Sequence, residues 1–154
     1  MQEVSDLYLL SGGEAEPPIL IDAVKANVSI DAIKLIIQLG AFINAVDVRH
    51  RTALHHACDI GSFDTIKLLL RKGAHYFLRD DSGRTPFHIV AALSSTKCLL
   101  LVLQNSQGSE EINDGDNEGL TPLHWAVAKN HTEHLDIMLS KKYRLDLKRT
   151  DIEL

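Results

Sequence analysis

The chain has few aromatic residues, few cysteines and no long apolar run. Aromatics make up 5% of its 154 residues, which is low for a β-sandwich and suits a helical core of Leu, Ile and Ala. Two cysteines make no disulfide framework at this length, so we expect a reducing compartment, cytoplasmic or nuclear. No apolar run approaches the roughly 20 residues of a membrane span, and the N-terminus lacks the pattern of a signal peptide, so we expect no membrane partner.

An excess of basic residues is also missing. The formal net charge is -5, with 16 Lys and Arg against 21 Asp and Glu, whereas nucleic-acid binders usually carry a strong basic excess. We therefore expect no nucleic-acid partner. A chain of this length buries about 68–70% of its unfolded surface, so it needs neither disulfides nor metal to hold a core.

A repeat is present instead. Three similar segments begin at Asp47, Asp80 and Asp116, at offsets of 33 and 36 residues. The same offsets relate Thr52, Thr85 and Thr121, and also His55, His88 and His124. An earlier, degenerate copy aligns Leu20 with Leu54 and Ala23 with Ala57. A fixed period in this range predicts a repeat solenoid, here of four units with an atypical first one.

Each copy predicts a turn, a helix, a short loop and a second helix. Thr is a good helix N-cap, and in two copies it is followed by Pro, which suits the first helical position. Apolar residues then recur three and four positions apart in both helices, as in Leu123, Ala126 and Val127. Gly83 and Gly119 mark tight turns before the Thr, and we expect His50 to adopt the same positive φ.

These residues carry a family resemblance. The motif written by Asp116, Gly119, Thr121, Pro122, Leu123, His124 and Ala126 resembles the ankyrin-repeat signature. The resemblance implies an all-α solenoid of stacked antiparallel helix pairs with β-hairpin-like turns. It places an extension at 1–17, repeats at 18–46, 47–79, 80–115 and 116–148, and a tail at 149–154. Polar residues in the last helix favour a true end of the stack, and the N-terminal ankyrin domain of a larger protein is the alternative.

The resemblance also implies a non-catalytic function, the binding of a protein partner. The expected surface is the concave groove formed by turn tips and first helices. Its candidate residues are Arg49, Arg51, Asp59, Ile60, Ser82, Arg84, Ala92, Leu93, Glu118, Leu120, Trp125 and Lys129. We expect a monomeric adaptor or inhibitor, similar to IκB-like or kinase-inhibiting ankyrin proteins, with no small-molecule substrate. A substrate-recruiting subunit of a larger complex, such as a ubiquitin ligase, is the alternative.

Several features of this surface leave two interpretations open. Ile60, Leu93 and Leu120 either form an exposed apolar line or are partly buried between repeats. Trp125 either covers a repeat edge or anchors a partner. Arginines at the tips of repeats two and three, followed by acidic residues, either orient a charged partner or are ordinary solvated surface. Charge reversal of Arg51 and Arg84 together is expected to weaken binding without unfolding the stack.

The remaining chemistry predicts no catalytic, cofactor or metal site. The resemblance gives His55, His88 and His124 a structural role in bridging neighbouring repeats. His131 and His134 lie three residues apart, but spacing fixes no third ligand. Cys58 and Cys98 fall at apolar helix positions, which favours buried free thiols over nucleophiles. The extra residues at 104–108 predict a lengthened polar loop over 104–115, or a finger that contacts a partner.

Overall fold

The computed structural model describes residues 18–106 and 110–140, which fold into stacked helix pairs. The pairs are α2 (Ile19–Lys25) with α3 (Ile30–Gln38), α4 (Ala53–Ile60) with α5 (Phe63–Arg71), α6 (Pro86–Ala92) with α7 (Thr96–Asn105), and α8 (Pro122–Ala128) with α9 (Thr132–Leu139). Within these ranges the extended pairing consists of one isolated bridge, Val46 with Thr52. The prediction of an all-α solenoid is confirmed. The extension 1–17 and the tail 149–154 lie outside the described residues.

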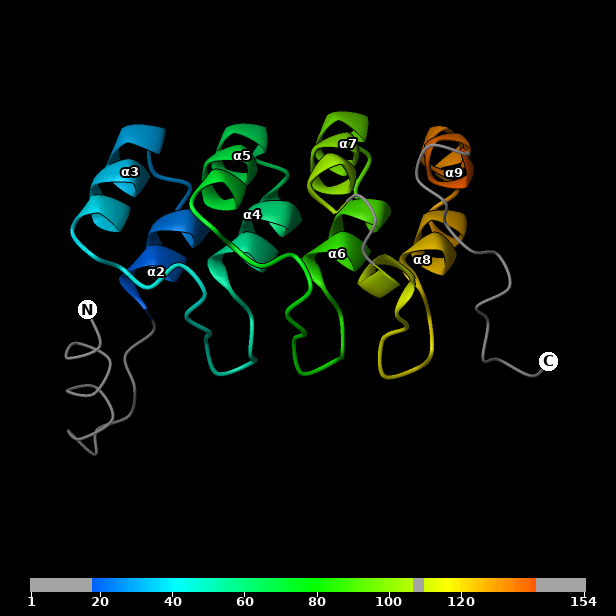
Figure 1. Cartoon of the computed structure of the whole chain (residues 1–154), viewed down its shortest axis with the longest axis horizontal. Helices are drawn as coiled ribbons and strands as arrows, with labels where there is room; N and C mark the ends of the chain where they lie inside the picture. Colours follow the sequence, from blue (N-terminus) through cyan, green and yellow to red (C-terminus); the bar gives the residue numbers. More distant parts are fainter. Residues whose placement is uncertain (1–17, 107–109, 141–154) are drawn as a thin grey trace.

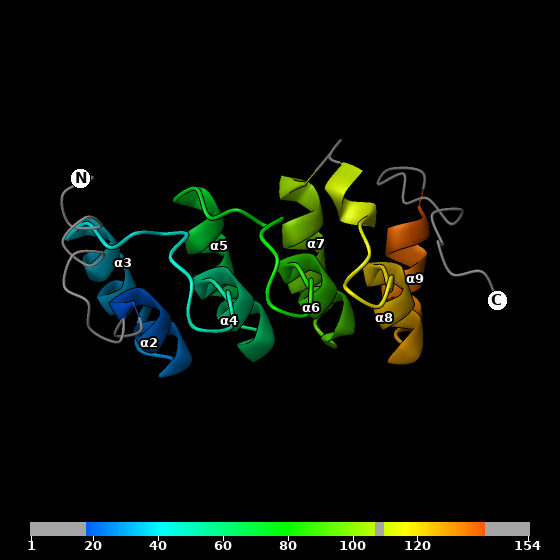
Figure 2. The same ribbon diagram turned by 90° about the horizontal axis from the view of Figure 1, so that it is seen from below.

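The helices form two rows, with a row of hairpin turns beyond the first (Figure 1). First helices α2, α4, α6 and α8 pack side by side, and second helices α3, α5, α7 and α9 form the other row. Seen from below in Figure 2, the connecting hairpins run across the first-helix row. We call the surface made by the first helices and the hairpin tips the inner face, and that made by the second helices the outer face. No helix in the described part of the chain is long and apolar enough to cross a membrane.

The first helices of repeats two to four begin at a Thr–His pair. The Thr52 backbone N–H donates to Nδ1 of His55 at 3.0 Å, and the His55 N–H donates back to the Thr52 hydroxyl at 3.4 Å. Thr85 and Thr121 donate their N–H groups in the same way, to His88 and His124. N–H groups at a helix start lack partners within the helix, so these contacts fix where each first helix begins.

The same histidines join one repeat to the next. His55 Nε2 donates to the Arg84 carbonyl at 3.1 Å, and His88 Nε2 donates to the Leu120 carbonyl at 3.0 Å. Because Nδ1 accepts from the Thr, the ring must be neutral with its proton on Nε2. The predicted bridging role is confirmed for these two residues. His124 lies in the last described pair and shows no such bridge within the described residues.

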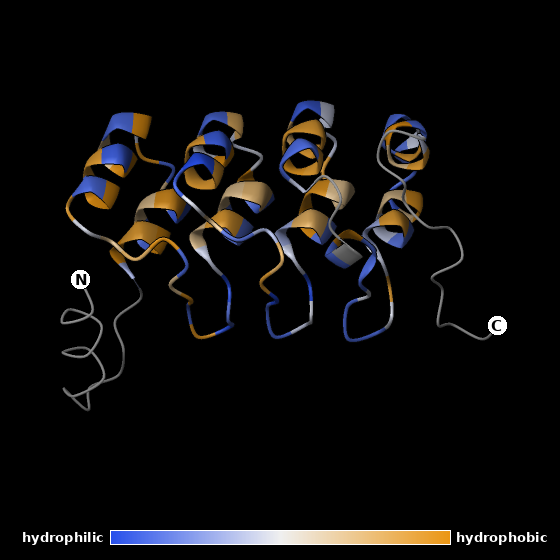
Figure 3. Ribbon diagram, viewed as in Figure 1, coloured by the Kyte–Doolittle hydropathy of each residue, from blue (hydrophilic) through white to orange (hydrophobic). Residues whose placement is uncertain are grey.

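The core runs between the rows along the stack. Its largest fully buried side chains include Leu54, Phe87, Leu99 and Met138, one or more from each of the last three repeats. Figure 3 shows the apolar sides of the helices facing one another across the rows. Each pair buries its apolar surface against its neighbours, so the fold has no single centre.

The insertion in repeat three is only partly a polar loop. Two of its residues extend α7 to Asn105, and a 3₁₀ turn, η1 (Glu110–Asn113), follows. Ile112 in this turn is buried at 7% exposure and belongs to the core. The segment is therefore anchored beside α8 at its C-terminal end, and residues 107–109 lie outside the described part.

Candidate functional site

Each hairpin is organised by its first Asp. In repeat two, Asp47 Oδ1 accepts the backbone N–H groups of Arg49 and Arg51 at 2.9 and 3.0 Å. Asp80 and Asp116 accept the equivalent two N–H groups in their own hairpins. A carboxylate that holds the N–H groups two and four residues ahead closes a tight turn. These carboxylates therefore have a structural role: their hydrogen bonds close the hairpins, and they are not part of the surface that contacts other molecules.

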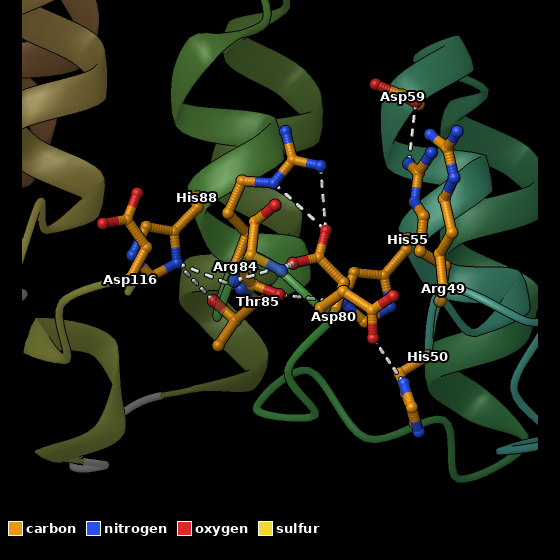
Figure 4. A network of polar contacts seen from close by, with 12 residues as sticks. Arg49, His50, His55, Asp59, Asp80, Arg84, Thr85, His88 and Asp116 are labelled. Atoms are coloured by element: carbon orange, nitrogen blue, oxygen red, sulfur yellow. Dashed lines mark hydrogen bonds and ion pairs between the residues drawn. The ribbon is translucent and has the colours of Figure 1, made fainter. Parts of the chain in front are cut away.

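The second oxygen of each Asp has a different partner in each repeat. His56 Nε2 donates to Asp47 at 2.8 Å, and the Trp125 indole N–H donates to Asp116 at 3.0 Å. Ile89 occupies the equivalent position in repeat three and has no hydrogen-bonding group. There the Arg84 guanidinium replaces it, with Nε 3.1 Å and Nη2 2.9 Å from Asp80 Oδ2 (Figure 4).

These contacts decide the charge state of the hairpins. Burial alone would raise the pKa of the Asp80 carboxyl, but the N–H and guanidinium groups of Arg84 outweigh it and hold the pKa below its usual value. For Asp47, burial is likewise outweighed, by the Arg51 N–H and the His56 ring, so its pKa is also lowered. Both carboxyls are ionised at neutral pH. The Arg84 guanidinium neutralises Asp80, whereas Asp47 keeps its charge and is stabilised by hydrogen bonds, because burial lowers the pKa of the His56 ring.

The hairpin tips are joined in a ladder. The Asp81 N–H donates to the Arg49 carbonyl, and the Asn117 N–H donates to the Ser82 carbonyl, both at 3.0 Å. His50 adopts φ +57°, as predicted, and its Nδ1 contacts the Asp81 carboxylate. The tips are therefore held in a fixed row, and a ligand would meet a preformed surface.

Five of the predicted site residues meet around one hollow on the inner face. Its apolar lining is supplied by Ile89, Ala92 and Leu93 of repeat three and by the Trp125 ring of repeat four. Asp59 lies on one side and Arg84 on the other, with the Arg84 guanidinium 5.9 Å from the centre of the Trp125 ring. The hollow therefore combines apolar walls with one anionic and one cationic edge.

Burial decides between the two interpretations of Ile60, Leu93 and Leu120. Leu93 is half-buried and packs across Gly61, and Leu120 is half-buried, whereas Ile60 is 43% exposed. The line of three exposed apolar residues is therefore absent, and only Ile60 remains. Trp125 is half-buried: its N–H fixes the repeat edge, in agreement with the first interpretation, and its ring lines the hollow. Its role as an anchor for a partner stays a prediction.

Most arginines at the hairpin tips are held in internal ion pairs, so fewer of them can contact a partner than the sequence indicates. Arg51 Nη2 lies 2.7 Å from Asp59, Arg84 is held by Asp80, and Arg79 lies 3.2 Å from Asp114. Arg49 is exposed and forms no ion pair within the described residues. Reversing Arg51 and Arg84 would break two internal ion pairs, one of them to a buried carboxylate, so this pair of changes is unsuitable as a pure test of binding.

The other predicted site residues lie around the hollow. Ser82 and Glu118 are exposed on the hairpin tips of repeats three and four, and Lys129 is exposed after the last residue of α8. Sequence reasoning missed Ile89 and His88 as lining residues. In the other repeats the residue equivalent to Ile89 bonds the turn Asp, and the residue equivalent to His88 bonds the Thr at the helix start. The sequence therefore gives these two positions structural roles, and only the structure shows that they also line the hollow.

The remaining histidines and thiols have structural contacts. His131 Nε2 and His134 Nδ1 donate to the Ala92 and Ala91 carbonyls, and no group of three metal-binding side chains occurs in the described part of the chain. Cys58 and Cys98 are buried free thiols, as predicted, and burial raises the pKa of Cys58 well above its usual value. Such a thiol is a poor nucleophile.

Comparison with known proteins agrees with the geometry. A family model described as ankyrin repeats (3 copies) matches residues 4–80 and 73–151. Inversin from Canis lupus familiaris is 32% identical over 110 residues, which cover 71% of this chain and 10% of inversin. Human inversin matches with the same identity and coverage. The chain thus spans about a tenth of the length of these relatives.

Proposed function

Because the chain belongs to the ankyrin-repeat family, we propose that it is a non-catalytic module that binds one protein partner through its inner face, as an adaptor or inhibitor. Ankyrin repeats are generally protein-interaction modules. The single observation that carries the choice of surface is the hollow between Asp59, Leu93 and Trp125, where five residues from three repeats converge. A hollow with aromatic and apolar walls and charged edges has the composition of a binding hot spot.

Two exposed residues beside the hollow add to the surface that a partner would contact. Arg49 and Ile60 are exposed beside the hollow's Asp59 edge and serve no ion pair or core contact that would explain them within the described residues. The tip ladder holds the surrounding backbone, so binding would order few further groups. The raised pKa of the Cys58 thiol supports a non-catalytic role, since it leaves no reactive nucleophile at that position.

The finer role stays part of this proposal. An adaptor, an inhibitor, and a substrate-recruiting subunit of a larger enzyme complex all use the same surface. We propose a cytoplasmic or nuclear setting and a chain that is monomeric when free. Recovering the partner distinguishes these roles, because its identity shows whether binding blocks it or brings it to an enzyme.

The test uses variants that leave the internal ion pairs intact. Arg49→Glu and Ile60→Asp change the inner face. Arg71→Glu and Leu139→Asp are matched controls on the outer face, since Arg71 is also exposed and Leu139 is 44% exposed, against 43% for Ile60. Affinity capture from cell extract is followed by quantitative mass spectrometry of the proteins retained by each variant.

The expected result is one protein that wild type and both controls retain equally. Each inner-face variant should reduce its recovery by about tenfold, the effect of roughly 1.4 kcal/mol at an interface. Equal losses with the outer-face controls, or full retention by both inner-face variants, would overturn the assignment of the inner face.

A further inference from the structure

Exposed apolar side chains gather at the first repeat. Of the twelve large apolar residues that are exposed in the described part of the chain, six belong to it and a seventh, Val48, lies in the hairpin that follows it. They are Ile19, Val28, Leu35, Leu39, Phe42, Val46 and Val48. In Figure 3 apolar colour reaches the outward side of α3 and the loop after it. The end of a solenoid normally carries polar residues on its open side, so this end needs a cover.

Ile19 shows most directly what is missing. It is the first residue of α2 and is 65% exposed, whereas the first residues of α4, α6 and α8 (Ala53, Pro86 and Pro122) are all buried. Each of those helices packs against the first helix of the preceding pair. Within the described residues no helix pair follows α9, and Pro122 is buried all the same. Contact with the preceding repeat is therefore enough to bury this position.

Two further positions repeat this pattern. Leu35 of α3 is 54% exposed, whereas Leu68 and Leu101, its equivalents in the next two repeats, are partly buried against the core. Val48 is 89% exposed, and its N–H has no hydrogen-bond partner in the described part of the chain. The equivalent N–H groups donate to the preceding hairpin tip. Ile19, Leu35 and Val48, which we call the open end, thus belong to an interface that every later repeat closes.

The chain itself carries a suitable occupant. Residues 4–10 read VSDLYLL, with five large apolar side chains and one charge, and they lie outside the described residues. Seven residues, 11–17, lie between Leu10 and Pro18, and the eight steps from one Cα to the other reach up to about 26–29 Å. Two packed helices are about 8–10 Å apart, so the tether spans the open end easily. The ankyrin-repeat model also begins its match at residue 4.

We propose that residues 4–10 cover the open end of the first repeat and take the place of a preceding repeat. A segment tethered so close to its site has a millimolar effective concentration, which favours it over a free partner or a second copy. The inference is independent of the proposed binding function, because it concerns the end of the stack and leaves the hollow unchanged.

The test is amide hydrogen exchange on the full chain. Leu7→Asp with Leu10→Asp should speed exchange in α2 and α3 by about tenfold or more, since an uncovered end opens more often. Exchange in α8, at the far end, should stay unchanged. Ser5→Asp with Ser11→Asp is the matched control, because it adds the same two charges at polar positions within the segment and directly after it, and it should change exchange by less than about twofold.

A second arm tests the face itself. Leu35→Asp should also speed exchange in α2 and α3. Adding it to the Leu7, Leu10 variant should give little further change, because both variants remove the same contact between the segment and the open end. Unchanged exchange in the Leu7, Leu10 variant would overturn the proposal. Sedimentation velocity gives an independent contradiction: a concentration-dependent dimer of the wild type that Leu35→Asp abolishes would show that a second copy covers the face.

Discussion

At the residue scale, stability depends on a few polar side chains that each serve two elements. His55 fixes the start of α4 through Nδ1 and holds the next repeat through Nε2. Both contacts need the neutral ring, because Nδ1 must accept. Burial lowers the pKa of His55 to about 4, and burial also lowers the pKa of His88. The stack is therefore built on histidines that folding keeps unprotonated.

Acid should destabilise the protein in a defined range. The unfolded chain binds protons to these rings below about pH 6.5, whereas folded His55 binds one only near pH 4, so the unfolding free energy falls as the pH drops through this window. For His55 the loss amounts to about 3 kcal/mol at most. Urea unfolding between pH 7.5 and 4.5 measures it, and His55→Gln should show a shallower dependence. A variant with the wild-type slope would contradict this role.

A glycine at a hairpin tip allows two repeats to approach. A Cβ on Gly83 would lie 2.3 Å from Oδ1 and 2.7 Å from N of Asn117, and Gly83 has φ +74°. Gly73 has φ +89° with nothing near its Cβ position, which makes it the matched control. Gly73→Ala should cost about 1–2 kcal/mol from the left-handed backbone alone.

Gly83→Ala should cost clearly more than Gly73→Ala, because it adds a clash with the neighbouring tip to the same backbone penalty. Chemical denaturation of the two variants and the wild type gives the comparison. Equal losses of stability would mean that the tips are not packed as the structure shows.

At the element scale, the hairpins share one backbone geometry but close it with different side chains. In repeat three Arg84 takes the role that His56 and Trp125 have in repeats two and four. Arg84→Gln should destabilise the hairpin by about 1–3 kcal/mol, since a buried carboxylate loses a charged partner. Ile89→His should recover part of this loss, because it supplies a donor from the position that His56 and Trp125 occupy.

A double-mutant cycle by urea unfolding separates these effects. The account expects Ile89→His to be less harmful, or even stabilising, in the Arg84→Gln protein than in the wild type. Strict additivity of the two changes would show that a His at residue 89 does not hydrogen-bond the Asp80 carboxylate.

The sequence predicts these elements well and their partners poorly. Helix starts at Thr52, Thr85 and Thr121 follow from local capping chemistry, and the positive φ of His50 follows from its alignment with Gly83. The ion pairs of Arg51 and Arg84 follow from no spacing rule, because several acidic residues lie equally near along the chain. Together with the Arg79–Asp114 pair, they leave Arg49 as the one tip arginine of repeats two and three without an ion pair in the described part of the chain.

At the scale of the whole molecule, the repeat predicts the architecture, and the ends depart from it. Periodic positions fix the two rows, since each pair repeats the same burial pattern. Five site residues could be assigned to one face from their repeat positions, and they meet at one hollow. The lining of the hollow and the exposure of Ile19 depend on which repeats lie next to each other. The sequence of one repeat alone does not predict them.

The central claim is that a protein partner binds the inner face. Hydrogen exchange of the chain, free and in complex with the captured partner, tests it most directly. The account predicts slower exchange in the hairpins over 47–52, 80–85 and 116–121 and in α4, α6 and α8, with α3, α5, α7 and α9 unchanged. Protection confined to the second helices, with the hairpins exchanging as in the free chain, would contradict it.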